Sequence, residues 1–133
     1  MMRDGLSDNA AHASCLLSPT NGVYFRHRDS AGATSTTTQT ANTVVPPEWV
    51  RLVRAGDTFT SYHSEDGSAW TLIGTQTIAM PDTLNVGLAV TATNDAALCT
   101  EFHERRAHAA GLHFSRDEKH RAGRRFIHVV VTY

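Results

Sequence analysis

The chain has 133 residues, 41% of them hydrophobic, and a formal net charge of −1, which is typical of a single soluble globular domain. No apolar run approaches the roughly 20 residues that span a bilayer, and residues 1–17 lack the basic and apolar segments of a secretory signal peptide. A transmembrane helix and an export signal are therefore not expected in this sequence.

Charge divides the chain into two parts. Residues 1–102 hold five arginines against ten acidic residues, whereas 103–133 hold seven basic residues against three acidic ones and five of the eight histidines. This contrast predicts a domain boundary near Phe102, with a folded body before it and a basic His/Arg-rich tail after it. Within the tail we expect a solvated segment at 103–124, while the apolar, β-branched run at 126–133 could dock as a late strand.

Short runs of strand-forming residues separated by turn signals fill the body. We expect strands at 12–18, 23–28, 48–54, 58–64, 70–78 and 84–92. The Thr-rich run at 33–45 suits either a strand or a loop, and Pro46-Pro47 interrupts strand pairing after it. Strands at this spacing predict an all-β sandwich.

The stretch SYHSEDGSAWTLIGT at 61–75 predicts a β-hairpin. Asp-Gly between two strand-forming runs is a strong hairpin signal, because Gly takes a positive φ without steric cost. We expect Asp66 to cap its own turn through an Asx-type hydrogen bond. We also expect Trp70 to pack over the hairpin, and the alternative is that its ring stacks on a ligand.

Residue alternation assigns the faces of two strands. In 48–54 we expect Val50 and Leu52 to point into the core, and Trp49, Arg51 and Val53 to point outward. In 84–92 the core face holds four apolar residues, which are Leu84, Val86, Leu88 and Val90. The opposite face holds small residues, which are Asn85, Gly87, Ala89 and Thr91. That second face is expected to be solvated or covered by a loop, and the alternative is the floor of a shallow trough.

Cys15 and Cys99 both lie in strand-like runs. We expect two buried thiols rather than one disulfide, since a free cysteine behaves as a small hydrophobic residue. The sequence contains no Cys/His spacing typical of zinc sites. His103 and His108 are five residues apart, which is too far for the pair of ligands on one helical face that binds zinc. No metal or other cofactor is expected.

Several motifs occur in order along 1–102. A Trp-x-Arg-Leu-x-Arg strand begins at Trp49, and a Gly-Asp-Thr-Phe turn begins at Gly56. A Tyr-x-Ser-x-Asp-Gly-x-x-Trp hairpin spans 62–70, and a Val-Gly-Leu-Ala-Val strand spans 86–90. With MMRDGL at the start and HASCLLSPTNGVYFRHR after it, this order resembles the concanavalin A-like jelly-roll modules of the "regulation of enolase protein" type.

The resemblance implies a jelly-roll sandwich that lacks its N-terminal strands, since a full module has further strands before the Met-x-Arg-Asp element. Open strand edges would then favour self-association. It also implies a non-catalytic, extracellular module for carbohydrate or protein recognition. The alternatives are an accessory or truncated piece of a glycan-processing enzyme, and a structural fragment that binds no ligand.

Glycoside hydrolysis needs two carboxylates that flank one bond. The adjacent pairs Glu65-Asp66 and Asp117-Glu118 would point to opposite faces of an extended strand, so glycosidase activity is not expected. The basic residues of the tail are scattered and have no aromatic platform among them, which argues against nucleic-acid binding. No membrane partner is expected either.

A glycan ligand would need exposed aromatic rings with polar side chains nearby. Tyr62 and Trp70 flank the predicted hairpin turn, and Tyr24 lies with Arg26 on a separate predicted strand. These four are the candidate ligand-binding residues.

Overall fold

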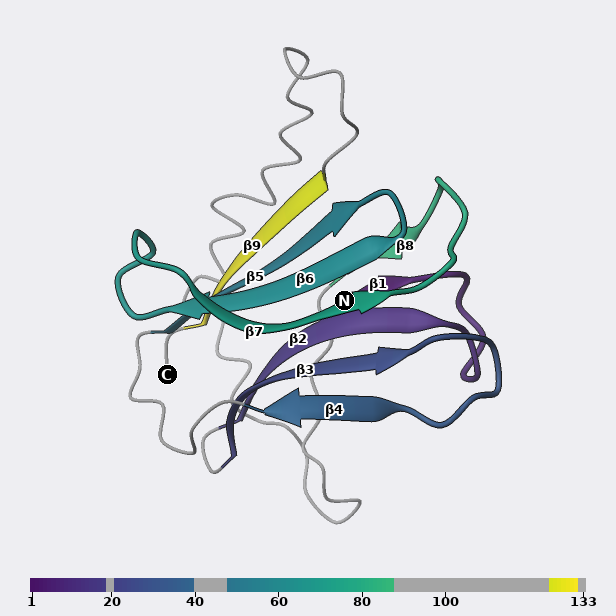
Figure 1. The fold of residues 1–133 in the computed structure, drawn as a ribbon, viewed down its shortest axis with the longest axis horizontal. Helices are drawn as coiled ribbons and strands as arrows, with labels where there is room; N and C mark the ends of the chain where they lie inside the picture. Colours follow the sequence, from purple (N-terminus) through teal and green to yellow (C-terminus); the bar gives the residue numbers. More distant parts are fainter. Residues whose placement is uncertain (19–20, 40–47, 88–124, 132–133) are drawn as a thin grey trace.

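The computed structural model of the chain describes residues 1–18, 21–39, 48–87 and 125–131, and these residues contain nine β-strands and no helix (Figure 1). The strands are β1 (Met2–Arg3), β2 (His12–Ser18), β3 (Gly22–Arg28), β4 (Thr36–Gln39), β5 (Glu48–Ala55), β6 (Thr58–Ser64), β7 (Thr71–Thr77), β8 (Asn85–Val86) and β9 (Arg125–Val131). The predicted all-β class is confirmed for this part of the chain.

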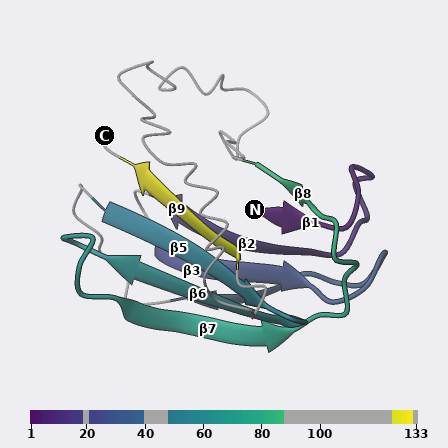
Figure 2. The same ribbon diagram turned by 90° about the horizontal axis from the view of Figure 1, so that it is seen from above.

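The strands form two antiparallel sheets. The first sheet has the order β4-β3-β2-β1-β8 and the second has the order β7-β6-β5-β9. Strand β2 packs on β5 and β6, and β3 and β4 pack on β7, so the two sheets face each other as layers (Figures 1 and 2). This arrangement is consistent with a β-sandwich.

Apolar residues from the inner faces of both sheets make one core. The buried cluster consists of Met2, Ala11, Ala13, Val23, Phe25, Val50, Leu52, Phe59, Ile73, Ile78 and Met80. Along β5, buried and half-buried residues alternate, which confirms that Val50 and Leu52 point inward and that Trp49 and Arg51 point outward. β5 thus turns one face toward the opposite sheet.

A glycine lets the two sheets approach closely at β7. A side chain at Gly74 would place its Cβ 3.2 Å from the Phe25 ring and 3.5 Å from Thr38. Nearby, the Gln76 side-chain amide donates a hydrogen bond of 2.9 Å to Asp29 Oδ2, which links the second sheet to the turn after β3. The absence of a side chain at this position therefore sets the local separation of the layers.

Two predicted strands are described only in part. Of the 84–92 strand, β8 contains Asn85–Val86, which pairs with Met2–Arg3, and Leu84 and Val86 pack against the core as expected. Residues 88–92 lie outside the described residues. In the Thr-rich run, Thr36–Gln39 form β4, and the described part of the chain resumes at Glu48.

The late strand expected in the tail is present as β9. It pairs antiparallel with β5, with Glu48 opposite Val131 and Arg54 opposite Arg125. The second sheet therefore joins a segment of the predicted body to a segment of the predicted tail. The segment 103–124 and the proposed boundary at Phe102 lie outside the described residues.

Candidate functional site

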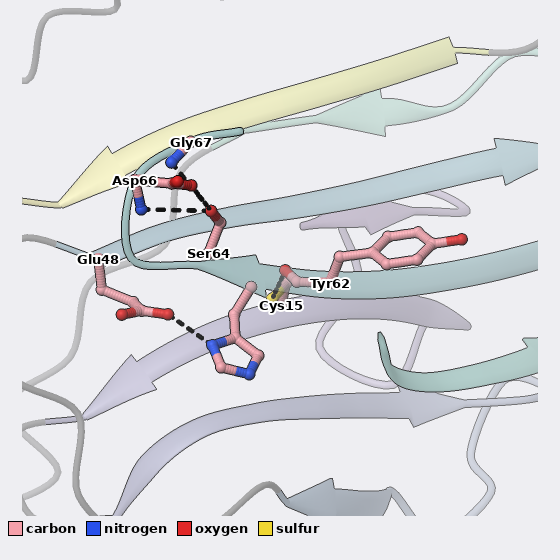
Figure 3. A network of polar contacts seen from close by, with 7 residues as sticks. Cys15, Glu48, Tyr62, Ser64, Asp66 and Gly67 are labelled. Atoms are coloured by element: carbon pink, nitrogen blue, oxygen red, sulfur yellow. Dashed lines mark hydrogen bonds and ion pairs between the residues drawn. The ribbon is translucent and has the colours of Figure 1, made fainter. Parts of the chain in front are cut away.

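The turn between β6 and β7 is held by two side chains (Figure 3). Ser64 Oγ accepts hydrogen bonds from the backbone N–H groups of Asp66 (3.3 Å) and Gly67 (2.9 Å). Asp66 Oδ1 accepts from the N–H groups of Ser68 (2.7 Å) and Ala69 (2.9 Å). These donors lower the pKa of Asp66, because they stabilise its ionised form. The predicted Asx-type cap is confirmed.

Trp49 is the aromatic residue that packs on the turn glycine. Gly67 has φ of +73°, and a Cβ added there would lie 3.1 Å from Cε2 of the Trp49 indole. Trp70, which we expected to pack over the hairpin, has its ring over Arg51. The turn therefore folds back onto the outward face of β5, where Trp49 is the first of the outward-pointing residues.

Arg51, Tyr62 and Trp70 form an aromatic–arginine cluster on the outer face of the second sheet. Arg51 lies directly opposite Tyr62 in the β5–β6 register. Its guanidinium carbon is 4.9 Å from the centroid of the Tyr62 ring and 4.0 Å from that of the Trp70 ring. Both distances fall in the range of cation–π contacts. Partial burial lowers the pKa of Arg51, because it removes water from the charged group.

The surroundings of this cluster are partly apolar. Leu72 lies opposite Tyr62 in the β6–β7 register and is 55% exposed. Tyr62 and Trp70 are half-buried, so each ring keeps an accessible portion. The cluster therefore presents fixed aromatic edges beside an exposed leucine.

The other two predicted site residues lie on the opposite side of the molecule. In β3, Phe25 points into the core, so Tyr24 and Arg26 point outward from the first sheet. Tyr62 and Trp70 lie on the outer face of the second sheet. The structure thus brings the four candidates together as two separate pairs, and one site cannot include all four.

Arg26 belongs to a group of basic residues that sequence analysis did not single out. His12 on β2 lies between Arg3 on β1 and Arg28 on β3 in the strand register. Arg26 is two residues before Arg28 on β3, so it lies on the same outward face. We call Arg3, His12, Arg26 and Arg28 the basic row. Alternation along 12–18 and 23–28 was the signal that could have placed three of them on one face.

A buried carboxylate is paired with a histidine at one end of β5. Glu48 is 1% exposed, and its Oε1 lies 2.6 Å from Nδ1 of His63 (Figure 3). The same alternation that turns Val50 and Leu52 inward also turns Glu48 inward, so its burial followed from the predicted faces. A buried carboxylate needs such a partner, because an unpaired buried charge is costly.

The other end of β5 holds a buried arginine. Arg54 donates hydrogen bonds from Nε to the Gly56 carbonyl (2.7 Å), from Nη1 to that of Pro81 (2.7 Å) and from Nη2 to that of Met80 (2.6 Å). Its guanidinium carbon also lies 5.3 Å from the Phe59 ring centroid. All three guanidinium nitrogens are used within the fold, which makes Arg54 a structural residue.

Cys15 is a free thiol that packs against the core. Its Sγ lies 3.8 Å from the Tyr62 carbonyl oxygen, and burial raises its pKa to about 11. A thiol with so high a pKa is a poor nucleophile. Cys99 lies outside the described residues, and no group of three or more His, Cys, Asp or Glu side chains suited to a metal ion occurs among the residues described.

No known protein family, curated protein or solved structure matches this sequence or its fold. No helix long and apolar enough to cross a membrane occurs in the described ranges.

Proposed function

We propose that this chain is a non-catalytic recognition module with a concanavalin A-like jelly-roll fold, and that it binds carbohydrate at the aromatic–arginine cluster. The observation that carries the proposal is the placement of the Arg51 guanidinium over both the Tyr62 and the Trp70 rings. The proposal of the jelly-roll class rests on the sequence motifs together with the two antiparallel sheets.

The contacts of the motif residues support this proposal. Trp49 packs on Gly67, Ser64 bonds to Asp66, and Arg51 lies against Tyr62 and Trp70. Residues of two of the motifs, the Trp-x-Arg-Leu-x-Arg strand and the 62–70 hairpin, therefore contact one another on the second sheet. Such a set is expected where a sheet face has a role beyond filling the core.

The cluster has properties that suit a sugar ring. An aromatic side chain offers a large apolar contact at little cost in side-chain freedom. The Arg51 contact restricts the two rings before any ligand arrives, which lowers the entropy lost on binding. The guanidinium also supplies donors for the hydroxyl groups of a sugar.

The proposed location is extracellular, as the resemblance implies. A protein ligand at the same surface, an accessory role beside a glycan-processing enzyme and a purely structural role are the alternatives. Self-association through strand edges stays a prediction.

A glycan array probed with the wild-type chain tests the proposal. The variants are Tyr62→Ala and Trp70→Ala, and the matched control is Thr75→Ala, which changes an exposed residue on β7 of the same sheet. We expect a glycan signal that Tyr62→Ala abolishes while the variant keeps a cooperative melting transition.

A wild-type chain that binds no glycan would refute carbohydrate recognition. Equal loss of signal in Thr75→Ala would show that the assay reports a general effect on the sheet rather than contact with the rings. Melting curves of every variant separate loss of fold from loss of contact.

A further inference from the structure

The outer face of the first sheet gathers positive charge that no carboxylate of the described residues neutralises. Arg3, His12 and Arg28 form one cross-strand row, and Ser14 and Arg26 are paired in the next row on the same face. Side chains directly opposite each other on one face have Cβ atoms about 5 Å apart. Three guanidinium groups and one imidazole therefore share a small area.

Within the described ranges, the guanidinium groups donate to neutral oxygen atoms. Arg3 Nη2 donates to the Ser7 carbonyl at 2.5 Å, and Arg28 Nη1 donates to the Asp8 carbonyl at 2.8 Å. Arg26 Nε donates to Thr37 Oγ1 at 3.2 Å. Among the described residues, none of these arginines has a carboxylate oxygen within 4.0 Å.

Hydrogen-bonding capacity is also left unused within the basic row. The Nε atoms of Arg3 and Arg28 are buried and have no hydrogen-bond partner. Both keep an N–H that could donate, since the guanidinium carries five donors. In a folded protein, buried donors of this kind are usually paired.

Ser14 provides an independent indication of a ligand. Its neighbours Ala13 and Cys15 pack in the core, so Ser14 points to the outer face, opposite Arg26. Ser14 is 0% exposed, and its Oγ is buried with no hydrogen-bond partner. A buried hydroxyl without a partner has lost its hydrogen bonds to water and gained none in return, which is unfavourable. A bound acceptor would remove that cost.

The electrostatics of His12 agree with this arrangement. Burial lowers its pKa, and the positive charges of Arg28, Arg3 and Arg26 lower it further. Its Nδ1 lies 3.4 Å from the Ala10 carbonyl oxygen, which leaves Nε2 facing away from that bond. The positive charges of the three arginines therefore act together at His12.

We propose that the basic row, together with Ser14, binds an oxyanion group of a ligand: sulfate, phosphate or carboxylate. Arginine guanidinium groups match these groups through paired, charge-assisted hydrogen bonds. The site lies on the sheet opposite the aromatic–arginine cluster, so it stands independently of carbohydrate binding there.

A purely structural role is the competing explanation. Arg3 and Arg28 both bond to carbonyls of the 7–10 segment, and they could serve only to hold it against β2. Arg26 distinguishes the two explanations, because within the described part of the chain its guanidinium donates to Thr37 on β4 and not to that segment. Ser14 distinguishes them as well, since it holds nothing in place.

The test is an amide and arginine Nε–H NMR titration of the full chain with sodium sulfate, sodium phosphate and sodium acetate in turn. Ionic strength is kept constant with sodium chloride. Sulfate and phosphate stabilise any protein by exclusion from its surface, and that effect does not saturate at low concentration. Saturable shifts at His12, Ser14 and Arg26 are therefore the expected sign of a site.

The variants are Arg26→Gln and Ser14→Ala, and the charge-matched control is Thr77→Glu, an exposed position on the second sheet. Loss of one charge-assisted hydrogen bond should weaken the affinity of Arg26→Gln about tenfold. Ser14→Ala should weaken it severalfold, whereas Thr77→Glu, which changes the net charge equally, should retain the wild-type affinity.

The anion that binds most tightly identifies the group on the ligand, and saturable binding of any of the three supports the site. The proposal is overturned if none gives a saturable shift at these residues. It is also overturned if Arg26→Gln and Ser14→Ala, both shown to be folded by their NMR spectra, bind as tightly as the wild type.

Discussion

The two outer faces of the sandwich both carry arginines, but the side chains that surround these arginines differ. On the second sheet, Arg51 lies over the Tyr62 and Trp70 rings. On the first sheet, Arg3 and Arg28 lie beside other cations and keep buried Nε atoms without partners. Arg51 Nε is buried without a hydrogen-bond partner as well, so the faces differ in what surrounds the guanidinium: aromatic rings cover it on the second sheet, and other cations lie beside it on the first.

The surroundings of a guanidinium separate an arginine that holds the fold from one that can bind a ligand. Arg54 is the reference case, because each of its three nitrogens donates to a backbone carbonyl. An arginine whose three nitrogens all donate within the fold contributes to stability. One with unused, buried donors in a group of like charges has binding capacity left over. Changes that break the internal contacts of the second sheet should therefore alter stability, apart from any effect on glycan binding there, and changes to the basic row should alter anion and proton binding.

The largest effect is expected from Gly67→Val, which disrupts the covered face. A β-branched residue at φ of +73° is strained, and its Cβ would press on the Trp49 ring. We expect a loss of about 3 kcal/mol in the free energy of unfolding. Chemical denaturation followed by tryptophan fluorescence measures it.

Gly32→Val is the matched control for that experiment. Gly32 has φ of +78°, but a Cβ there would meet nothing within 4 Å. It should lose only the backbone contribution, about 1–2 kcal/mol. Equal losses in the two variants would mean that Trp49 does not pack on the turn.

A double-mutant cycle of Arg51→Ala and Trp70→Ala sharpens the description of the covered face. The guanidinium lies 4.0 Å from the Trp70 ring centroid, so the two losses should not add. We expect a coupling free energy of about 1 kcal/mol, measured by thermal melting. A coupling indistinguishable from zero would contradict a stacked arginine.

A pH titration of stability tests the other face. Because the pKa of His12 is lowered in the folded state, protons bind the unfolded chain more tightly. The contribution of His12 is fully present above the unfolded value of about 6.5 and is lost as the pH falls below it. Its slope cannot exceed about 1.4 kcal/mol per pH unit, the limit for one proton.

The comparison for that titration is His12→Gln, in which this part of the slope should be absent. The charged groups that act on His12 are Arg28, Arg3 and Arg26. An oxyanion bound among them would oppose their effect, so saturating sulfate should make the wild-type slope shallower. A slope identical in wild type and His12→Gln would show that His12 does not titrate differently on folding.

The smallest effect is expected from Ser14→Ala in the absence of added anion. Removal of a buried hydroxyl that has no partner should raise the free energy of unfolding by about 0.5 kcal/mol. Ser68→Ala, at an exposed position in the β6–β7 turn, should leave it unchanged. A destabilised Ser14→Ala would indicate that the hydroxyl does have a partner in the folded protein.

Local sequence chemistry predicted much of the fold. The Asp66-Gly67 pair specified a turn, and alternation in 48–54 specified which face of β5 is buried. Both depend on neighbours within a few residues, where backbone geometry limits the choices. The sequence indicated that 126–133 could dock as a strand, but it did not indicate β5 as the partner. Pairing between strands far apart in the chain depends on packing that a single sequence does not reveal.

The candidate site was harder to predict for the same reason. Aromatic residues could be picked out as candidates, but Tyr24 and Tyr62 belong to different sheets, and sequence distance does not show which outer face a strand will join. The basic row was missed because Arg3 and Arg28 are far apart in the chain and meet only through β2.

The β5–β9 pairing also bears on how the chain folds. Partners such as Arg54 and Arg125 lie about 70 residues apart, and closing loops of that length slows folding. During synthesis, β5 emerges well before β9. Until β9 is made, the edge of β5 that will pair with it has no β9 partner. An unpaired strand edge invites other chains to pair with it. The yield of folded protein should therefore depend more on how soon β9 reaches β5 than on the final stability of the sandwich.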